Sequence, residues 1–132
     1  MPESFEMSIE LPTNPAKIYD AWLNGTHHSA FTGSLATCDP KVGGKFTAWD
    51  GYIWGSNLEL HTNQRILQSW RTSEFPEGSP DSRLEIILEP TTRGTKLILR
   101  HNNIPDGQGQ GYQQGWQDFY FNPLCEYFAE TD

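Results

Sequence analysis

The sequence lacks the features that mark several common protein classes. Its only two cysteines, Cys38 and Cys125, lie far apart and outside any metal-ligand spacing, so we expect two free thiols. No run of about eighteen apolar residues occurs, and no basic segment followed by an apolar one opens the chain. We therefore expect neither a membrane span nor a secretory signal, and a soluble protein of the cytoplasm.

Basic residues are scarce as well. Nine Lys and Arg residues stand against seventeen Asp and Glu residues, which gives a net charge of −8. Nucleic-acid phosphates and anionic membrane surfaces both attract basic faces, so we expect no nucleic-acid partner and no membrane partner. The acidic charge suits a basic surface on a protein partner, although solubility alone would also explain it.

Motifs for nucleophilic catalysis or phosphate binding are missing too. There is no G-x-S-x-G segment, and neither cysteine has the local signature of a catalytic thiol. The segment Val42-Gly43-Gly44-Lys45-Phe46 lacks the glycine spacing, the hydroxyl residue and the following helix of a phosphate-binding loop. It predicts a turn that leads into a strand.

The four histidines do not form a pattern that predicts a metal site. His27 and His28 are adjacent, so on a helix their side chains would point about 100° apart, and we expect a surface pair. His61 and His101 lie on predicted strands without cysteines or acidic residues at ligand spacing. We expect no metal ion and no cofactor.

Glu59 and His61 come nearest to an acid–base pair, because they share one face of a predicted strand. Leu58 and Leu60 occupy the opposite face, so we expect the pair to face solvent. We therefore predict no catalytic residues and a protein that is not an enzyme.

What the sequence does contain is an aromatic segment near its end, Gly109 to Glu130. Apolar residues recur there at intervals of three and four with polar residues opposite, which predicts a long amphipathic helix. A helix with so wide an apolar side needs a broad partner, such as a curved sheet. The expected inner face comprises Tyr112, Trp116, Phe119, Tyr120, Leu124 and Tyr127, with Phe121 and Phe128 beside it.

Two residues inside this predicted helix oppose helix formation. Gly115 should cost about 1 kcal/mol relative to alanine, and we expect it to let another backbone approach beside Trp116. Pro123 cannot donate a hydrogen bond to the Phe119 carbonyl, so we expect a kink there.

Before that helix, the pattern predicts one strand, one or two short helices and then a series of strands. Residues Phe5 to Leu11 alternate between apolar and polar, as a half-buried strand does. Asn14 and Pro15 predict the start of a helix and Asn24-Gly25 its end. The segment from His27 to Phe31 allows a second short helix.

The segment from Leu35 to His101 is typical of short strands separated by turn residues, with a strong hairpin signal at Asp50-Gly51. Consecutive strands with short turns favour an antiparallel meander. The strand after this hairpin is expected to bulge at Gly55 and to bury one face that comprises Tyr52, Trp54, Leu58 and Leu60. Together these elements predict a single α+β domain over residues 1–132. Its curved antiparallel sheet of six to seven strands wraps around the long C-terminal helix.

Aromatic side chains are the candidates for a binding site. They could line a cavity between sheet and helix and hold an apolar ligand, or they could simply fill the core. The candidates are Trp22, Phe31, Phe46, Trp54, Trp70, Trp116, Phe119 and Tyr120.

Short segments in a fixed order carry a family resemblance over nearly the whole chain, from about Ile9 to Phe128. They are Phe31-Thr32, Gly43-Gly44-Lys45-Phe46, Asp50-Gly51, Ile66 with Trp70-Arg71, Phe75-Pro76-Glu77-Gly78, Gly94-Thr95-Lys96-Leu97, Asn103-Ile104-Pro105, and Gln114-Gly115-Trp116 with Tyr120-Phe121. No single segment is specific. Together they resemble the C-terminal domain of the activator of heat shock protein 90 ATPase family, within the START-like, helix-grip (SRPBCC) superfamily.

The resemblance implies a sheet of six or seven strands around a long C-terminal helix. It also implies a co-chaperone that binds a heat shock protein 90 type ATPase chaperone and favours its closed, hydrolysing state. In the full co-chaperones a separate N-terminal domain does much of the binding, and we expect no such domain within these 132 residues. Other members of the superfamily bind small apolar molecules, and some act as cyclases or dehydratases. A hydrophobic-ligand carrier and a polyketide cyclase-like enzyme are therefore the alternative functions.

Overall fold

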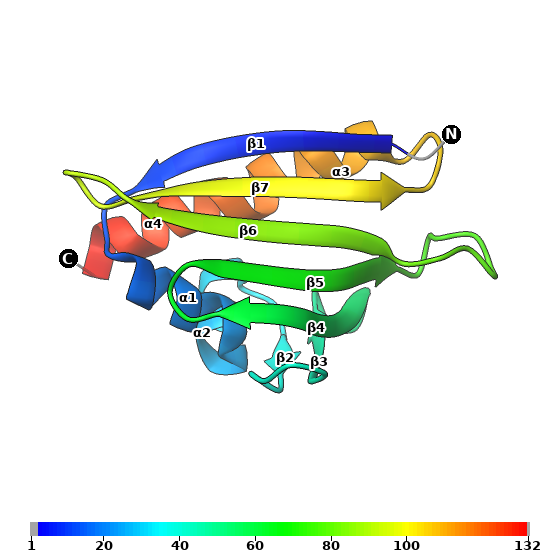
Figure 1. Cartoon of the computed structure of the whole chain (residues 1–132), viewed down its shortest axis with the longest axis horizontal. Coiled ribbons are helices and arrows are strands. Elements are labelled where there is room, and N and C mark those ends of the chain that lie inside the picture. Colours follow the sequence, from blue (N-terminus) through cyan, green and yellow to red (C-terminus); the bar gives the residue numbers. More distant parts are fainter. Residues whose placement is uncertain (1–2, 132) are drawn as a thin grey trace.

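Seven antiparallel strands form one curved sheet in the computed structural model, which describes residues 3–131 (Figure 1). The strand order is β1-β7-β6-β5-β4-β3-β2, so strands β2 to β7 form the expected meander and β1 pairs at its far edge with β7. The strands are β1 (Glu3–Leu11), β2 (Thr37–Cys38), β3 (Lys45–Ala48), β4 (Ile53–His61), β5 (Arg65–Thr72), β6 (Ser82–Pro90) and β7 (Thr95–Ile104).

The first strand shows the period of two that its sequence predicts. Side chains at its odd-numbered positions are partly or fully buried, and the polar residues between them are exposed. Antiparallel pairing with β7 places Met7 opposite Leu99 and Ile9 opposite Leu97. Leu97 and Leu99 are fully buried. The first and last strands of the chain therefore contribute to the same core-facing surface.

Two short helices, α1 (Pro15–Leu23) and α2 (Gly25–Thr32), follow β1. The Asn14 side chain accepts a hydrogen bond from the Lys17 amide at 3.0 Å and so caps α1. Asn24 ends α1 and also caps α2, by accepting from the amides of Thr26 and His27 at 2.9 and 3.2 Å. Within residues 3–131 no helix has the length and apolar composition needed to cross a membrane.

The C-terminal helix, expected as one long element with a kink at Pro123, consists of three segments: α3 (Gly109–Trp116), the π-helical turn η1 (Gln117–Phe121) and α4 (Asn122–Thr131). In the π turn, the Asn122 amide donates to the carbonyl of Gln117, five residues earlier. This wider turn lies directly before Pro123, whose ring would clash with the Phe119 carbonyl in a regular α-helix. The irregularity that Pro123 predicts is therefore a π turn just upstream of it.

The π turn changes which aromatic residues face the core. It accommodates one residue more than an α-helical turn, so the helix beyond it is rotated relative to a uniform 100° pattern. Phe119, expected on the inner face, is 56% exposed, and Tyr127 is only partly buried. Phe121 and Phe128 occupy buried positions. The helix is where the sequence predicts it, but its inner face is shifted.

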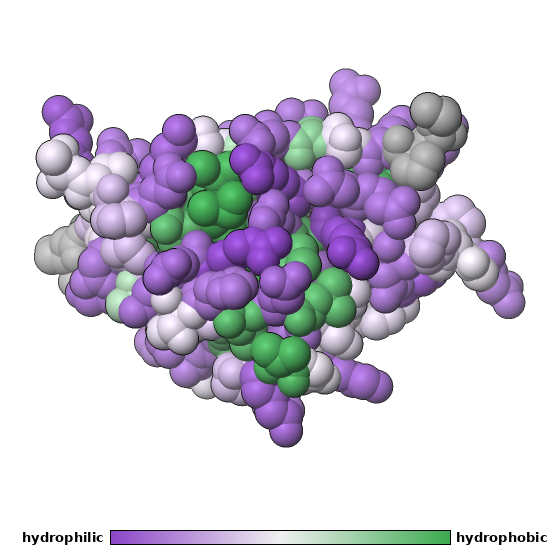
Figure 2. Space-filling view, in the orientation of Figure 1, coloured by the Kyte–Doolittle hydropathy of each residue, from purple (hydrophilic) through white to green (hydrophobic). Residues whose placement is uncertain are grey.

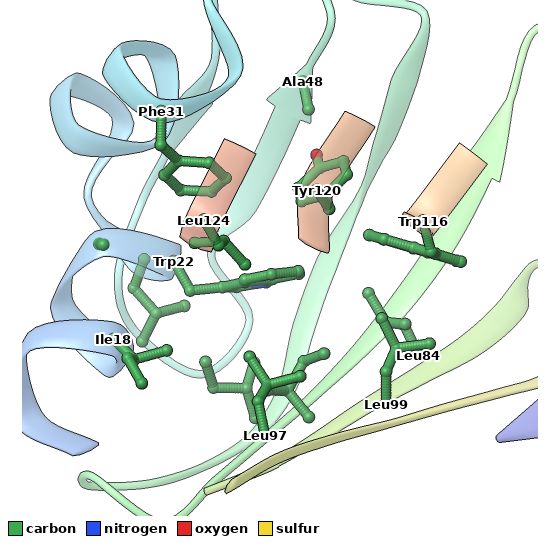
Figure 3. Close-up of a cluster of buried hydrophobic side chains, with 14 of the residues drawn as sticks. Ile18, Trp22, Phe31, Ala48, Leu84, Leu97, Leu99, Trp116, Tyr120 and Leu124 are labelled. Atoms are coloured by element: carbon green, nitrogen blue, oxygen red, sulfur yellow. The ribbon is translucent and has the colours of Figure 1, made fainter. Parts of the chain in front are cut away.

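The C-terminal helix lies against the inner face of the sheet, and α1 and α2 lie beside it (Figure 1). Figure 3 shows Trp22 of α1 between the C-terminal helix and leucines of the sheet. The Trp22 ring centroid lies 6.0 Å from that of Trp116 and 5.3 Å from that of Tyr120. Leu84 and Leu97 of the sheet complete this part of the core.

The buried residues of strand β4 differ from those that the sequence predicts. A bulge between Asn57 and Glu59 shifts its register with β5, so residues on the two sides of the bulge do not share one face. Trp54 and Leu58 are exposed, at 39% and 38%, whereas Ile53 and Asn57 are buried. The prediction that Trp54 faces inward is wrong because the period of two was extended across the bulge.

Two glycines do not have the roles that the sequence suggested for them. At Gly55, where we expected the bulge, an added Cβ would lie 1.9 Å from the Ser69 carbonyl oxygen of the neighbouring strand. At Gly115, an added Cβ would meet only the Phe119 side chain, at 3.9 Å. The close backbone approach that we expected at Gly115 is therefore absent there and present at Gly55.

Charged side chains form a row across the outer face of the sheet. Arg100 of β7 pairs with Glu6 of β1 at 2.7 Å and with Glu85 of β6 at 3.5 Å, and Arg65 of β5 pairs with Glu85 and, at 3.0 Å, with Glu59 of β4. Figure 2 shows this side of the molecule, where hydrophilic residues surround smaller hydrophobic patches. The outer face is thus largely polar, as one wet face of an antiparallel sheet should be.

Candidate functional site

A pocket of about 570 Å³ opens between the sheet and the start of the C-terminal helix. Its walls come from four places: the turn between β3 and β4, the end of β5 with the loop that follows, α3 with the loop that precedes it, and η1. The volume lies within the range of small-molecule sites. The lining residues are Trp49, Tyr52, Ile53, Trp70, Glu74, Gly107, Gln108, Gly111, Tyr112, Gly115, Trp116, Phe119 and Tyr120.

Aromatic rings form most of the pocket wall. Trp70, Trp116 and Tyr120 are buried and form its inner part, where the Trp116 ring centroid lies 5.7 Å from Trp70 and 4.6 Å from Tyr120. Trp49 and Phe119 lie nearer the solvent, with ring centroids 5.6 Å apart. The pocket therefore runs from an exposed aromatic rim to a buried aromatic interior.

Two of the three glycines of α3 leave the space beside the helix open. Gly111 and Gly115 are one helical turn apart, and both line the pocket. An added Cβ would have no neighbour within 4 Å at Gly111 and only the Phe119 ring edge, at 3.9 Å, at Gly115. Each glycine costs a helix about 1 kcal/mol relative to alanine. No close packing offsets that cost, so the effect of these glycines is to leave the pocket open.

A closed ring of hydrogen bonds defines one end of the pocket. The Glu74 amide donates to the Thr72 hydroxyl at 3.1 Å, and that hydroxyl lies 2.7 Å from the Tyr112 hydroxyl. Tyr112 donates to Gln108 Oε1 at 2.6 Å, and Gln108 Nε2 donates to the Glu74 carbonyl at 2.9 Å. Since the single Tyr112 proton goes to Gln108, Thr72 donates to Tyr112. This ring joins the loop after β5 to the start of α3.

The Glu74 carboxylate lies at this end and accepts a hydrogen bond from the Tyr52 hydroxyl. Burial and the hydrogen bond to Glu74 raise the pKa of Tyr52 to about 12. Burial also raises the pKa of Tyr112. Both phenols are therefore neutral near pH 7, and Glu74 is the one acidic side chain among the lining residues.

The start of α3 is also held by the first strand. The Glu3 carboxylate accepts hydrogen bonds from the amides of Gly107 and Gly109, at 3.1 and 2.7 Å. These backbone hydrogen bonds lower the pKa of Glu3. A carboxylate at a helix N-terminus also interacts favourably with the helix dipole. This contact positions the helix that carries the two glycines.

Beneath the pocket, a buried histidine joins the helix to the sheet. Trp116 Nε1 donates to His101 Nδ1 at 3.1 Å, so His101 Nε2 carries the proton and donates to Ser82 Oγ at 2.8 Å. Ser82 in turn donates to the Trp70 carbonyl at 2.6 Å. Burial lowers the pKa of His101 to about 3. The neutral imidazole therefore links two of the aromatic walls, Trp70 and Trp116.

A second buried histidine, His28 of α2, supports Tyr120 in the same way. Its Nδ1 donates to the Trp22 carbonyl at 3.1 Å, and its Nε2 accepts from the Tyr120 hydroxyl at 2.9 Å. Burial lowers the pKa of His28 to about 4. The expectation of a surface pair is correct for His27 but wrong for His28, because the two side chains point about 100° apart on α2, His27 toward solvent and His28 into the core.

Among the residues proposed from sequence, the pocket brings together Trp70, Trp116, Phe119 and Tyr120. Trp22, Phe31 and Phe46 are buried but belong to the neighbouring core. Trp22 there donates from Nε1 to Gln68 Oε1 at 3.3 Å. Trp54, on the outer face, does not line the pocket.

Sequence reasoning missed the residues at the rim and the polar end of the pocket. Trp49 and Tyr52 flank the predicted Asp50-Gly51 turn, whose residues have positive φ angles. Glu74 and Gln108 lie in loops, where no periodicity identifies inward-facing side chains. The available signal was the pair Gly111 and Gly115, four residues apart inside an otherwise helical pattern.

Chemically, this arrangement is suited to binding. Among residues 3–131 no cluster of three or more His, Cys, Asp and Glu residues could hold a metal ion. His61 lies 3.5 Å from Glu59, and both side chains are exposed on the outer face, away from the pocket. The pocket itself offers aromatic surface, one carboxylate and neutral hydroxyl and amide groups.

The sequence is similar to a known protein family. Residues 12–129 match the family described as Activator of Hsp90 ATPase homolog 1-like protein. The human activator of 90 kDa heat shock protein ATPase homolog 1 is 28% identical over 117 residues, which are 89% of this chain and 34% of that protein. The homologue from Dictyostelium discoideum is 27% identical, over 87% of this chain and 30% of that protein. The chain thus spans about a third of the length of these curated relatives.

Solved structures agree in fold. The crystal structure of an HSP90 activator from Plasmodium falciparum has a TM-score of 0.80 and 31% identity, and the match covers 90% of this chain and 91% of that one. A protein from Mesorhizobium loti has a TM-score of 0.82 at 21% identity, over 98% of this chain and 99% of that chain, and shows similarity of fold alone. On the match over residues 12–129, the chain belongs to the Activator of Hsp90 ATPase homolog 1-like protein family.

Proposed function

We propose that this chain is a co-chaperone-like domain that binds a heat shock protein 90 type chaperone and modulates its ATPase activity. The observation that carries the proposal is the family match over residues 12–129. The 31% identity to a solved HSP90 activator over most of both chains supports it. In this proposal the chain acts by binding, without a reaction of its own, and shares the cytoplasmic compartment of its chaperone.

The test is a titration of the chain into the heat shock protein 90 type chaperone from the same source, at low salt, with ATP hydrolysis as the readout. A saturable change in turnover, together with binding measured by calorimetry, is the expected result. The matched control is the same chain denatured by heat before addition, which should have no effect. Absence of both binding and a rate change would reject the proposal.

The pocket favours a second function, the binding of a small apolar ligand. Its volume of about 570 Å³ and its aromatic wall support this function. Native mass spectrometry of the protein as isolated is the direct test. A mass excess that disappears in a Gly115→Leu variant, whose side chain would fill the pocket, supports ligand binding. A protein of bare mass that also binds no apolar probe rejects it.

A further inference from the structure

The pocket lining carries charge of one sign only, and that charge is negative. Glu74 is acidic, and the lining contains no lysine, arginine or histidine. The nearby Arg71 is engaged elsewhere, because it donates to the Ser79 carbonyl at 2.9 Å and to the Asp81 carboxylate at 2.8 Å. An anionic ligand would therefore enter a site with no positive partner and with a carboxylate of its own sign.

The aromatic wall has the same electrostatic preference. The face of an aromatic ring carries negative charge density and attracts cations within about 6 Å of its centroid. Tyr52 and Tyr112 lie at the Glu74 end, and Trp70 and Trp116 continue the wall inward. The Trp70 ring centroid lies 5.0 Å from that of Tyr112. Tyr112, Trp70 and Trp116 thus contact one another in sequence, and Tyr52 contacts the carboxylate itself.

A neutral apolar ligand would satisfy only part of this site. It would cover the rings but would offer no charged partner to Glu74, which is exposed. The Tyr52 hydroxyl supplies one hydrogen bond to the carboxylate, and a carboxylate accepts several. The unmatched feature of the pocket is thus a negative charge next to aromatic faces.

We propose that this pocket binds an organic cation, with an ammonium or trimethylammonium group beside the Glu74 carboxylate and against the tyrosine rings, and an apolar body against Trp70 and Trp116. This inference rests on the second candidate function, ligand binding, and is independent of chaperone binding. The cationic group can form an ion pair with the carboxylate and cation–π contacts with the ring faces at the same time. The apolar body fills the space that Gly111 and Gly115 leave open.

Three probes test the proposal: hexyltrimethylammonium, hexanol and hexyl sulfate. They share a hexyl group and differ only in the head group. Binding is followed by tryptophan fluorescence and by calorimetry at low salt. We expect the cation to bind about tenfold more tightly than the alcohol, because it adds an ion pair and cation–π contacts, and the sulfate to bind most weakly. Equal affinity for cation and alcohol, or tighter binding of the sulfate, overturns the inference.

Three variants test whether the preference for the cationic probe comes from the pocket. Glu74→Gln keeps an acceptor for Tyr52 and removes the charge, so the affinity for the cation should fall to that for hexanol. Glu77→Gln, in the same loop but outside the lining, is the matched control and should leave both affinities unchanged. Gly115→Leu should abolish binding of all probes while the protein remains folded by circular dichroism. A Glu74→Gln variant that keeps the full cation preference contradicts the proposal.

The outcomes separate this inference from the function it rests on. Hexanol binding that Gly115→Leu abolishes, without any preference for the cation, rejects the organic-cation assignment and retains an apolar-ligand site. Binding of none of the three probes rejects both. The chaperone titration is a separate readout and does not depend on either result.

Discussion

At the scale of single residues, glycine has two opposite uses in this protein. Gly55 is required because β4 and β5 pass so close that an added Cβ would lie 1.9 Å from the Ser69 carbonyl oxygen. Gly115 has open space beside it and lowers the stability of the helix that contains it. The local sequence around the two residues does not distinguish these roles, because what decides them is whether another strand or open space lies beside the glycine.

The same substitution at the two positions should therefore change stability in opposite directions. Gly115→Ala should raise the free energy of unfolding by up to about 1 kcal/mol, because alanine favours the helix and meets no neighbour closer than 3.9 Å. Gly55→Ala should lower it by about 2 kcal/mol or more, because β5 would have to shift. Urea denaturation of both variants checks this pair. Destabilisation by Gly115→Ala would show that the helix tolerates no side chain there.

The two buried histidines predict a loss of stability in mild acid. Burial lowers the pKa of His28 to about 4 and that of His101 to about 3, whereas an unfolded histidine has a pKa of about 6.5. Below that value the unfolded chain binds more protons than the folded one. The free energy of unfolding is therefore highest above about pH 6.5. As pH falls from there toward the folded-state pKa, each histidine should lower the free energy of unfolding by up to about 1.4 kcal/mol per pH unit.

Urea denaturation at a series of pH values from about 7 to about 5 measures this effect, since most carboxylates stay ionised in that range. A His101→Gln variant should show about half the slope of the unaltered protein, whatever its absolute stability, because one of the two groups no longer titrates. A slope that His101→Gln leaves unchanged would mean that other groups take up the protons.

At the scale of elements, the C-terminal helix is the part on which core and pocket both depend. Trp116 lies at the end of α3, is buried, and contacts Trp22, Trp70 and Tyr120. It also holds His101 in the tautomer that is protonated at Nε2, because the indole N–H donates to Nδ1. The π turn follows directly and sets which residues of α4 face the sheet.

Trp116→Ala should lower the free energy of unfolding by about 3–5 kcal/mol, because it leaves a large cavity and an unpaired His101 nitrogen. Trp54→Ala, which removes the same side chain from the outer face, is the matched control and should cost less than about 1 kcal/mol. Chemical denaturation of both variants measures the difference. Similar losses in the two variants would contradict the face assignment of β4.

At the scale of the whole molecule, the net charge of −8 is the property that bears most directly on the proposed partner. The row of ion pairs on the outer face engages Arg65 and Arg100 with three glutamates. An acidic protein approaches a basic surface faster than a neutral one, and salt screens that attraction.

If the chain acts on a chaperone through a basic surface, its effect on ATP turnover should weaken as salt rises from about 0.05 M to about 0.5 M, because the Debye length falls below the width of the contact. The ATPase titration repeated at these two salt concentrations is the measurement, with the chaperone alone at each concentration as control. If the effect on ATP turnover does not change with salt, the contact with the chaperone is made by apolar surface instead.

Much of the fold follows from local pattern, because strands, caps and turns are determined by residues close in the chain. The alternation in Phe5 to Leu11, the cap at Asn14 and the hairpin signal at Asp50-Gly51 all correspond to observed elements. The aromatic wall was predicted in part for the same reason, since Trp116 and Tyr120 share the inner side of a helix.

Taken by itself, the sequence determined the order of elements, the antiparallel meander, the C-terminal helix and the acidic charge, all of which depend on composition and on spacing of a few residues. Tertiary structure decided the bulge that turns Trp54 outward and the π turn that buries Phe121. It also decided the pocket, which exists only where loops carrying Glu74 and Gln108 meet a helix face without side chains. The physical reason is that an open space depends on the convergence of distant segments, and no local pattern records which of them will meet.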